Sequence, residues 1–333
     1  MFGVNKILLE QCVPAMEVTN KQWKQTIRCR LNQLIRFPEI QTTLPLSHAQ
    51  FLTSTDLPAI GSSNEEWVTA RFYNRARYLL LLINHEQSPK AFMIRRNGEI
   101  FVVRVHAPLP LFDGTLLDGH ITPHNTFVTI DALAVAGQSL CDDDYVTRMR
   151  AVPVLPQRPV TEQTTWLELQ LRPFWLSQEC PLSLKDQDKI FILVQSPWLN
   201  GRSIRAFRCQ QSPCIDFAVL PGSPTSSTID TVHLAVKEEH LEPNKRVLLP
   251  VILNYPVTTE LRTIMNINGN NMGNMNLIVE FQLIPTGWKP LRIRTDRTNP
   301  NRKSSYDRML QANKDSDEIT KFLNFVHTPK PKV

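Results

Sequence analysis

The sequence predicts an α+β fold in two domains, a larger one over residues 1–238 and a smaller one over residues 239–333. Length is the first reason, since 333 residues are two to three times a typical domain of about 100–150 residues. Composition is the second, because 42% hydrophobic and 20% charged residues supply enough apolar side chains for a core. The third is a series of short apolar segments separated by turn residues, with helical periodicity before and after it.

The larger domain is expected to begin with a helix. Apolar residues at helical spacing over residues 18–35, among them Trp23, Ile27 and Leu31, indicate an amphipathic helix that ends before Pro38. Strands are predicted for residues 77–84, 91–95 and 99–105, with a hairpin turn at residues 96–98. Shorter apolar segments continue the series, at residues 115–117, 127–130, 189–195 and 217–220.

The smaller domain has a different pattern of apolar and polar residues. Residues 246–253, 261–266, 275–284 and 291–294 alternate as strands do, and a helix is predicted for residues 304–326. Short strands at this spacing, followed by a helix, favour a five-stranded barrel of the oligonucleotide-binding (OB) type.

Glycine and cysteine exclude several function classes. The chain has 11 glycines and 25 prolines, and 11 glycines are about 3% of the residues against a usual value of about 7%. Neither GxGxxG nor GxxxxGK[ST] occurs, so Rossmann and P-loop sites are excluded. The six cysteines form no CxxC pair, and the longest apolar run, residues 78–83, is too short to cross a membrane. We therefore expect an intracellular protein of the nucleus or cytoplasm, without a membrane partner.

Two acidic residues stand out in the larger domain. Residues 111–120 read LFDGTLLDGH, and residues 127–139 read FVTIDALAVAGQS. We expect Asp118 and Asp131 to lie at the ends of adjacent strands, where carboxylates can hold a metal ion or a ribose hydroxyl. The alternative is ordinary turn chemistry, since Asp-Gly is common in turns.

A basic motif stands out in the smaller domain, in a chain whose net charge is +6. Residues 288–301 read WKPLRIRTDRTNPN. Arg292 and Arg294 alternate along a strand and so share one face, which suits a polyphosphate. Asp296 is placed to orient one of these basic groups. The alternative is a solvated edge of the barrel.

In the order of these segments, the chain resembles the mRNA guanylyltransferases, or capping enzymes, of the covalent nucleotidyltransferase superfamily. The basic motif is the most specific match. The other matching stretches are residues 37–47, 67–82, 115–119, 127–137, 215–221 and 234–238. The resemblance implies a nucleotidyltransferase domain of the DNA-ligase-like, ATP-grasp-like type, followed by an OB-fold domain.

The resemblance also implies a reaction and a site. A lysine attacks the α-phosphate of GTP, and GMP then passes to a diphosphate RNA 5′ end, with Mg²⁺ or Mn²⁺ as cofactor. The implied partners are GTP, an RNA 5′ end and a protein of a capping or transcription complex. Nucleotide or phosphate contacts are implied for Arg77, Lys237, Arg292, Arg294, Asp296 and Arg297, and metal contacts for Asp118 and Asp216.

The sequence departs from the family at the nucleophile. Phe72 stands at the position of the lysine, and a phenyl ring cannot form a phosphoramidate. Arg71, one residue earlier, stays protonated and is no nucleophile. Lys90, on the next strand, is the nearest substitute, although a solvated hairpin lysine is the simpler interpretation. Bulk replaces glycine at Arg75 and Phe217, which indicates a remodelled nucleotide pocket.

Two hypotheses follow. The chain is a guanylyltransferase-like protein of 5′ mRNA capping, or it is a non-catalytic subunit that binds a cap, an RNA 5′ end or a nucleotide beside an active capping enzyme. A general single-strand-binding barrel is a third hypothesis, which the sparse aromatic residues make weaker.

Overall fold

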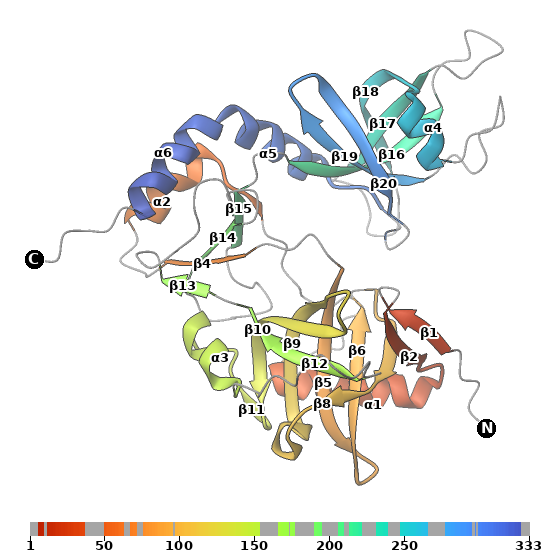
Figure 1. The fold of residues 1–333 in the computed structure, drawn as a ribbon, viewed down its shortest axis with the longest axis vertical. Helices are drawn as coiled ribbons and strands as arrows, with labels where there is room; N and C mark the ends of the chain where they lie inside the picture. Colours follow the sequence, from red (N-terminus) through yellow and green to blue (C-terminus); the bar gives the residue numbers. More distant parts are fainter. Residues whose placement is uncertain are drawn as a thin grey trace, which may run out of the picture.

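The computed structural model confirms the expected α+β class (Figure 1). It describes residues 6–9, 12–36, 50–62, 67–71, 76–95, 97–153, 166–172, 174–176, 190–194, 206–209, 213–221, 231–238, 247–265, 277–294, 297 and 299–327. Their strands form three sheets, of ten, five and five strands. Within these residues no helix is long and apolar enough to cross a membrane.

The large sheet has the strand order β1-β2-β7-β6-β5-β9-β10-β12-β8, and β11 pairs with β10. Neighbouring strands run antiparallel except β12, which runs parallel to β10 and to β8. The strands are β1 (Lys6–Leu9), β2 (Val13–Glu17), β5 (Arg77–His85), β6 (Ser88–Arg95), β7 (Ile100–Val103), β8 (Val105–His106), β9 (Asp113–Ile121), β10 (Thr126–Val135), β11 (Gln138–Ser139) and β12 (Leu167–Leu171). The strands predicted at residues 77–84, 91–95 and 127–130 are thereby confirmed.

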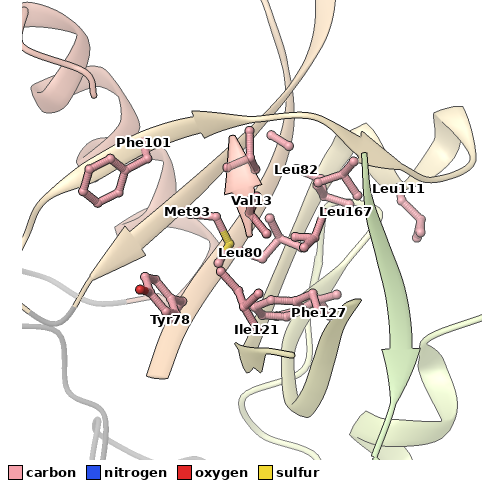
Figure 2. Packing of buried hydrophobic residues seen from close by; sticks show 14 of the residues in the cluster. Val13, Tyr78, Leu80, Leu82, Met93, Phe101, Leu111, Ile121, Phe127 and Leu167 are labelled. Atoms are coloured by element: carbon pink, nitrogen blue, oxygen red, sulfur yellow. The ribbon is translucent and has the colours of Figure 1, made fainter. Parts of the chain in front are cut away.

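Both faces of the large sheet are covered, which explains the uninterrupted apolar run at residues 78–83. Side chains alternate between the faces of a strand. Leu79 and Leu81 therefore face the side of α1 (Lys21–Ile35), whereas Tyr78, Leu80 and Leu82 form the core on the other face (Figure 2). The helix η2 (Leu109–Phe112) adds Leu111 and Phe112 to this second core.

Helix α1 begins and ends at clear signals. The side chain of Asn20 accepts a hydrogen bond of 3.0 Å from the backbone N–H of Trp23, which caps the first turn. Arg36 takes the left-handed conformation, with φ of 54°, and ends the helix. A second helix, α3 (Tyr145–Ala151), is capped by Asp144 in the same way and packs on β10.

The small sheet has the order β13-β4-β14-β15-β3. Its strands are β3 (Gln50–Phe51), β4 (Trp67–Arg71), β13 (Phe174–Leu176), β14 (Ile190–Val194) and β15 (Ala206–Cys209). Strand β4 belongs to this sheet, whereas the next strand along the chain, β5, belongs to the large sheet.

The third sheet, which we call the OB sheet, has the order β18-β17-β16-β19-β20. Its elements are β16 (Cys214–Pro221), β17 (Thr231–Lys237), β18 (Leu248–Pro256), α4 (Thr259–Met265), β19 (Ile278–Ile284) and β20 (Gly287–Ile293). Counted along the chain, this is the order 3-2-1-4-5 with a helix between the third and fourth strands, as in OB folds. The sheet takes β16 and β17 from before residue 239, so it spans the expected domain boundary.

Two predicted elements differ in the structure. Residues 261–266, predicted as a strand, lie largely in helix α4. Leu261 and Met265 are buried four residues apart while Thr263 is exposed, and this is a helical period. Thr258 caps the helix by accepting a hydrogen bond of 3.2 Å from the N–H of Leu261. The helix predicted at residues 304–326 is divided into α5 (Lys303–Lys314) and α6 (Ser316–His327).

These last two helices return to the N-terminal half of the chain (Figure 1). They reach the segment formed by β3, η1 (Ser54–Asp56) and α2 (Leu57–Ser62). Arg308 donates to the carbonyl of Phe51 at 2.7 Å and pairs with Asp56, and Asp315 accepts from the N–H of Ser54 at 2.8 Å. Apolar packing of Leu57, Ile60, Phe207, Ile319 and Phe322 accompanies these polar contacts.

Candidate functional site

Two buried carboxylates lie side by side in the OB sheet. Asp216 of β16 is the register partner of Glu280 of β19, and each residue is 3% exposed. Like charges directly opposite each other on neighbouring strands repel, and burial adds a desolvation cost. A stable sheet at this point therefore requires cations.

Three arginines of the basic motif supply them. Arg294 lies between the two acids, with Nη1 3.0 Å from Oδ1 of Asp216 and 3.9 Å from Oε1 of Glu280. Arg292 places Nε 2.7 Å from Oε2 of Glu280, and Arg297 places Nη1 2.8 Å from Oδ2 of Asp216. We call these three arginines and two acids the OB cluster. Its formal charge is +1.

The arginines of the OB cluster differ in exposure. The side chain of Arg294 is 10% exposed, that of Arg297 is 32% and that of Arg292 is 55%. A guanidinium carries five N–H donors. Arg292 and Arg297 can therefore keep their carboxylates and still bind oxygens of a ligand, whereas Arg294 serves mainly to neutralise the buried acids.

The end of the motif ties the cluster to the sheet. Asn301 accepts a hydrogen bond from the N–H of Asp216 at 2.8 Å through Oδ1, and its own N–H donates to the Asp216 carbonyl at 2.9 Å. The N–H of Lys237 donates to the carbonyl of Asn301 at 2.8 Å. The structure thus brings Lys237 to the same corner of the sheet as Asp216. Asp296 lies outside the described residues.

Sequence reasoning missed Glu280 and Asn301. Glu280 left a signal, because it is the single charged residue in the apolar strand IVEFQLI of β19. A carboxylate at the centre of such a strand is buried and needs a cationic partner. Asn301 lay within the matched motif, but its bonds to a strand 85 residues away could not be seen in the sequence.

A second pair of carboxylates lies in the large sheet. Asp118 of β9 and Asp131 of β10 are register partners on adjacent strands, as predicted, but each lies inside its strand and not at the expected strand end. Arg77 donates through Nε to Asp118 at 2.7 Å, and Arg148 donates to both oxygens of Asp131 at 2.9 and 3.0 Å. The Asp-Gly sequence here lies within a strand and not in a turn. A Cβ on Gly119 would come within 2.4 Å of the Val128 carbonyl oxygen, so close packing requires this glycine.

Burial and ion pairing act against each other in this second pair. Burial raises the pKa of the Asp118 carboxyl, against the effect of Arg77. Burial also opposes the charge on Arg148, but Asp131 outweighs it and the pKa of Arg148 is raised. Each acid has an arginine as its close partner.

The implied metal ligands do not meet. Asp118 belongs to the large sheet and Asp216 to the OB sheet, and guanidinium groups neutralise both. No group of three or more His, Cys, Asp or Glu side chains suited to a metal ion occurs among the described residues. Because their oxygens are paired with guanidinium groups and the two residues lie in different sheets, the two carboxylates do not fit a shared divalent cation.

The predicted substitute nucleophile has structural partners. Lys90 places Nζ 3.1 Å from Glu86 and 4.7 Å from the centre of the Trp23 ring. Both contacts are of the kind that hold a lysine side chain on a protein surface. Phe72 and Arg75 lie outside the described residues, so the remodelled pocket around them stays a prediction.

Strand β4, the last described element before Phe72, pairs within the small sheet. Strand β4 ends at Arg71, where Ile190 of β14 is its register partner, and β15 pairs with β14. The matched stretches at residues 215–221 and 234–238 lie instead in β16 and β17 of the OB sheet. Phe217 is fully buried there, against the rings of Phe281 and Trp288, and fills the OB core.

No family model and no curated protein matches the sequence. Among solved structures, the chain is similar to "mycobacterial DNA ligase D complexed with ATP and MES", with a TM-score of 0.37 and 12% identity over 76% of this chain and 94% of that chain. It is also similar to Pmar-Lig_Pre, with a TM-score of 0.34 and 9% identity over 78% of this chain and 66% of that chain. It is similar as well to Pmar-Lig_PreS3, with a TM-score of 0.33 and 9% identity over 84% of this chain and 71% of that chain.

Proposed function

We propose that this chain is a guanylyltransferase-like protein of 5′ mRNA capping that binds a triphosphate, of GTP or of an RNA 5′ end, at the OB cluster. The observation that carries the proposal is the pair Arg292 and Arg297, which are anchored to buried acids yet 55% and 32% exposed. Anchoring reduces the conformational entropy that each arginine loses on binding, and guanidinium groups bind phosphate oxygens bidentately.

Phe72 favours a second candidate, a non-catalytic subunit. In covalent transfer of GMP, a lysine Nζ bonds to the α-phosphorus of GTP while the bond to the pyrophosphate oxygen breaks. Phe72 cannot take this part, and Lys90 is held by Glu86 and Trp23. Under this candidate the chain binds the RNA 5′ end or the nucleotide, and another protein transfers GMP.

One labelling experiment separates the two candidates. The protein is incubated with α-³²P-labelled GTP and Mg²⁺ or Mn²⁺, denatured, and tested for label that stays on the chain. Retained label establishes covalent transfer, and its loss in Lys90→Ala would identify that residue as the nucleophile. No label, together with binding of GTP or triphosphate RNA, supports the non-catalytic candidate.

A second experiment tests the binding site itself. Affinity for GTP and for a 5′-triphosphate RNA is measured for Arg292→Gln and Arg297→Gln. Each variant removes a charge-assisted contact, so we expect weaker triphosphate binding and a smaller salt dependence. Lys314→Gln, at an exposed position on α5, is the matched control. Unchanged affinity in both arginine variants would mean that the OB cluster is only structural.

A further inference from the structure

Helix α1 carries nearly all of the net positive charge of the chain. Residues 21–36 contain Lys21, Lys24, Arg28, Arg30 and Arg36 and no acidic residue, which gives a formal charge of +5 against +6 for all 333 residues. The remaining 317 residues are therefore almost neutral as a set.

The apolar face of α1 is already in use. Ile27, Leu31 and Leu34 are at most 3% exposed and pack against the large sheet. The helix therefore has no apolar stripe left for a lipid bilayer or for a partner helix. What it presents to solvent is polar and basic, with Gln22, Gln25 and Cys29 exposed between the cations.

Helix stability does not account for these cations. Lys21 and Lys24 lie in the first turns, where the helix dipole favours acidic residues by about 0.3–1 kcal/mol each and disfavours basic ones. Lys24 and Arg28 are four residues apart, a like-charge pair that costs about 0.2–0.5 kcal/mol. The first turn holds no acidic residue.

Some of the cations have structural partners and others do not. Arg36 pairs with Asp142 at 2.7 Å, and Arg30 donates to the carbonyl of Asp113 at 3.2 Å. Lys24 lies 3.9 Å from Glu17, at the limit of an ion pair. The side chains of Lys21 and Arg28 make no hydrogen bond or ion pair with the described part of the chain. We call Lys21, Lys24 and Arg28 the α1 basic face.

We infer that the α1 basic face binds the phosphate backbone of single-stranded RNA, at a place separate from the OB cluster. The three cations span two turns, about 10 Å along the helix axis, so they can contact successive phosphates of an extended strand. The exposed glutamines can donate to the same oxygens. The proposal goes beyond 5′-end binding, because it concerns the body of the RNA and does not depend on a nucleotide pocket.

The test uses a 20-nucleotide oligo(U) with a 5′-hydroxyl, so that a triphosphate site contributes nothing. Fluorescence anisotropy gives its affinity at several salt concentrations for the protein and for the triple variant Lys21→Gln, Lys24→Gln, Arg28→Gln. Loss of three phosphate contacts should reduce the slope of log K against log salt by about 2, since each contact on a single strand contributes about 0.7. This corresponds to an affinity about 100-fold lower at 0.1 M salt, with the difference vanishing near 1 M.

The control triple variant carries the same change in charge at exposed positions elsewhere, Arg104→Gln, Lys314→Gln and Lys321→Gln. We expect it to keep most of the affinity and the slope. Equal losses in the two triple variants would overturn the proposal, because net charge alone would then explain binding.

Two further readouts keep the result decisive. A labelled 20-residue polyglutamate is tested in the same way, and a loss of polyglutamate binding without a loss of RNA binding would assign the face to an acidic protein instead.

The α1 triple variant should unfold at the same or a higher temperature than the natural chain, because unfavourable helix charges are removed. If it unfolds earlier, the double variant Lys21→Gln, Arg28→Gln, which keeps the Lys24–Glu17 contact, must reproduce the RNA defect or the proposal fails.

Discussion

The large sheet and the OB sheet each bury two carboxylates that are register partners on adjacent strands. In the large sheet, Asp118 and Asp131 have Arg77 and Arg148 as close partners, and the Arg148 side chain is fully buried while that of Arg77 is 29% exposed. In the OB sheet, Asp216 and Glu280 hold three arginines, two of which reach solvent. The same arrangement of acids therefore has one close arginine per acid in the large sheet, whereas in the OB sheet three arginines contact the two acids.

This difference separates a structural role from a binding role. A pair that neutralises itself inside the protein has no charge to offer a ligand. The OB cluster has one positive charge more than it needs, and two of its arginines are only partly desolvated. A polyphosphate can therefore bind there without the breaking of an internal ion pair.

The largest effect is expected in the large sheet. Arg148→Ala leaves Asp131 buried without its principal cation and should reduce the free energy of unfolding by about 3–5 kcal/mol. The double variant Arg148→Met, Asp131→Leu removes both charges and should recover most of this loss. Urea denaturation measures both. A loss below about 1 kcal/mol in Arg148→Ala would show that the pair is not structural.

A smaller effect is expected at the centre of the OB cluster. Arg294→Ala removes the cation between Asp216 and Glu280, but Arg297 and Arg292 still contact these acids. We expect a loss of about 2 kcal/mol in urea denaturation. A loss as large as that of Arg148→Ala would contradict the division of roles among the three arginines.

Arg292→Ala should separate binding from stability. Its side chain is 55% exposed but is the nearest cation to the buried Glu280, which keeps only the more distant Arg294, so the free energy of unfolding should fall by about 1–2 kcal/mol. Triphosphate affinity should fall in the same variant, because a direct contact is lost. The two sheets would no longer differ as proposed if Arg292→Ala impaired folding and left affinity unchanged.

The smallest effect is expected at an acid outside both buried pairs. Although burial works in the other direction, hydrogen bonds from Ser54 and Gln311 lower the pKa of the Asp315 carboxyl below its ordinary value of 3.8. Its stabilising contribution is therefore present above the unfolded-state pKa and is lost as the pH falls through the lower, folded-state pKa. At pH 5, Asp315→Asn should have a lower free energy of unfolding than the natural chain. This difference should vanish at more acidic pH, where Asp315 of the natural chain is protonated. A difference independent of pH would contradict this.

Local patterns predicted local structure well. Helix α1 follows from its periodicity, and β5 follows from its apolar run. Alternation along β20 and into the residue after it predicted that Arg292 and Arg294 share a face, and both approach Glu280. Residues 261–266 misled because a short apolar segment fits a strand and a helix alike, and only the buried positions of Leu261 and Met265 decide between them.

Pairing between distant strands could not be predicted in this way. The patterns of β16 and β17 indicate strands but not the sheet that they join. The partners of Asp216, namely Arg294 and Arg297, lie about 80 residues further along the chain. Glu280 was visible as a charge in an apolar strand, but its partners depend on the register of three strands.

The return of α5 and α6 to η1 has a consequence during synthesis. The N–H of Ser54 bonds to a carboxylate 261 residues later. At a translation rate of about 5–20 residues per second, that partner leaves the ribosome about 13–50 s after Ser54. Leu57 and Ile60 pack against Ile319 and Phe322, which are synthesised after a similar delay. Until α6 has been made, only Leu52 and Phe207 of this cluster can cover the segment, so part of its apolar surface stays exposed on the nascent chain.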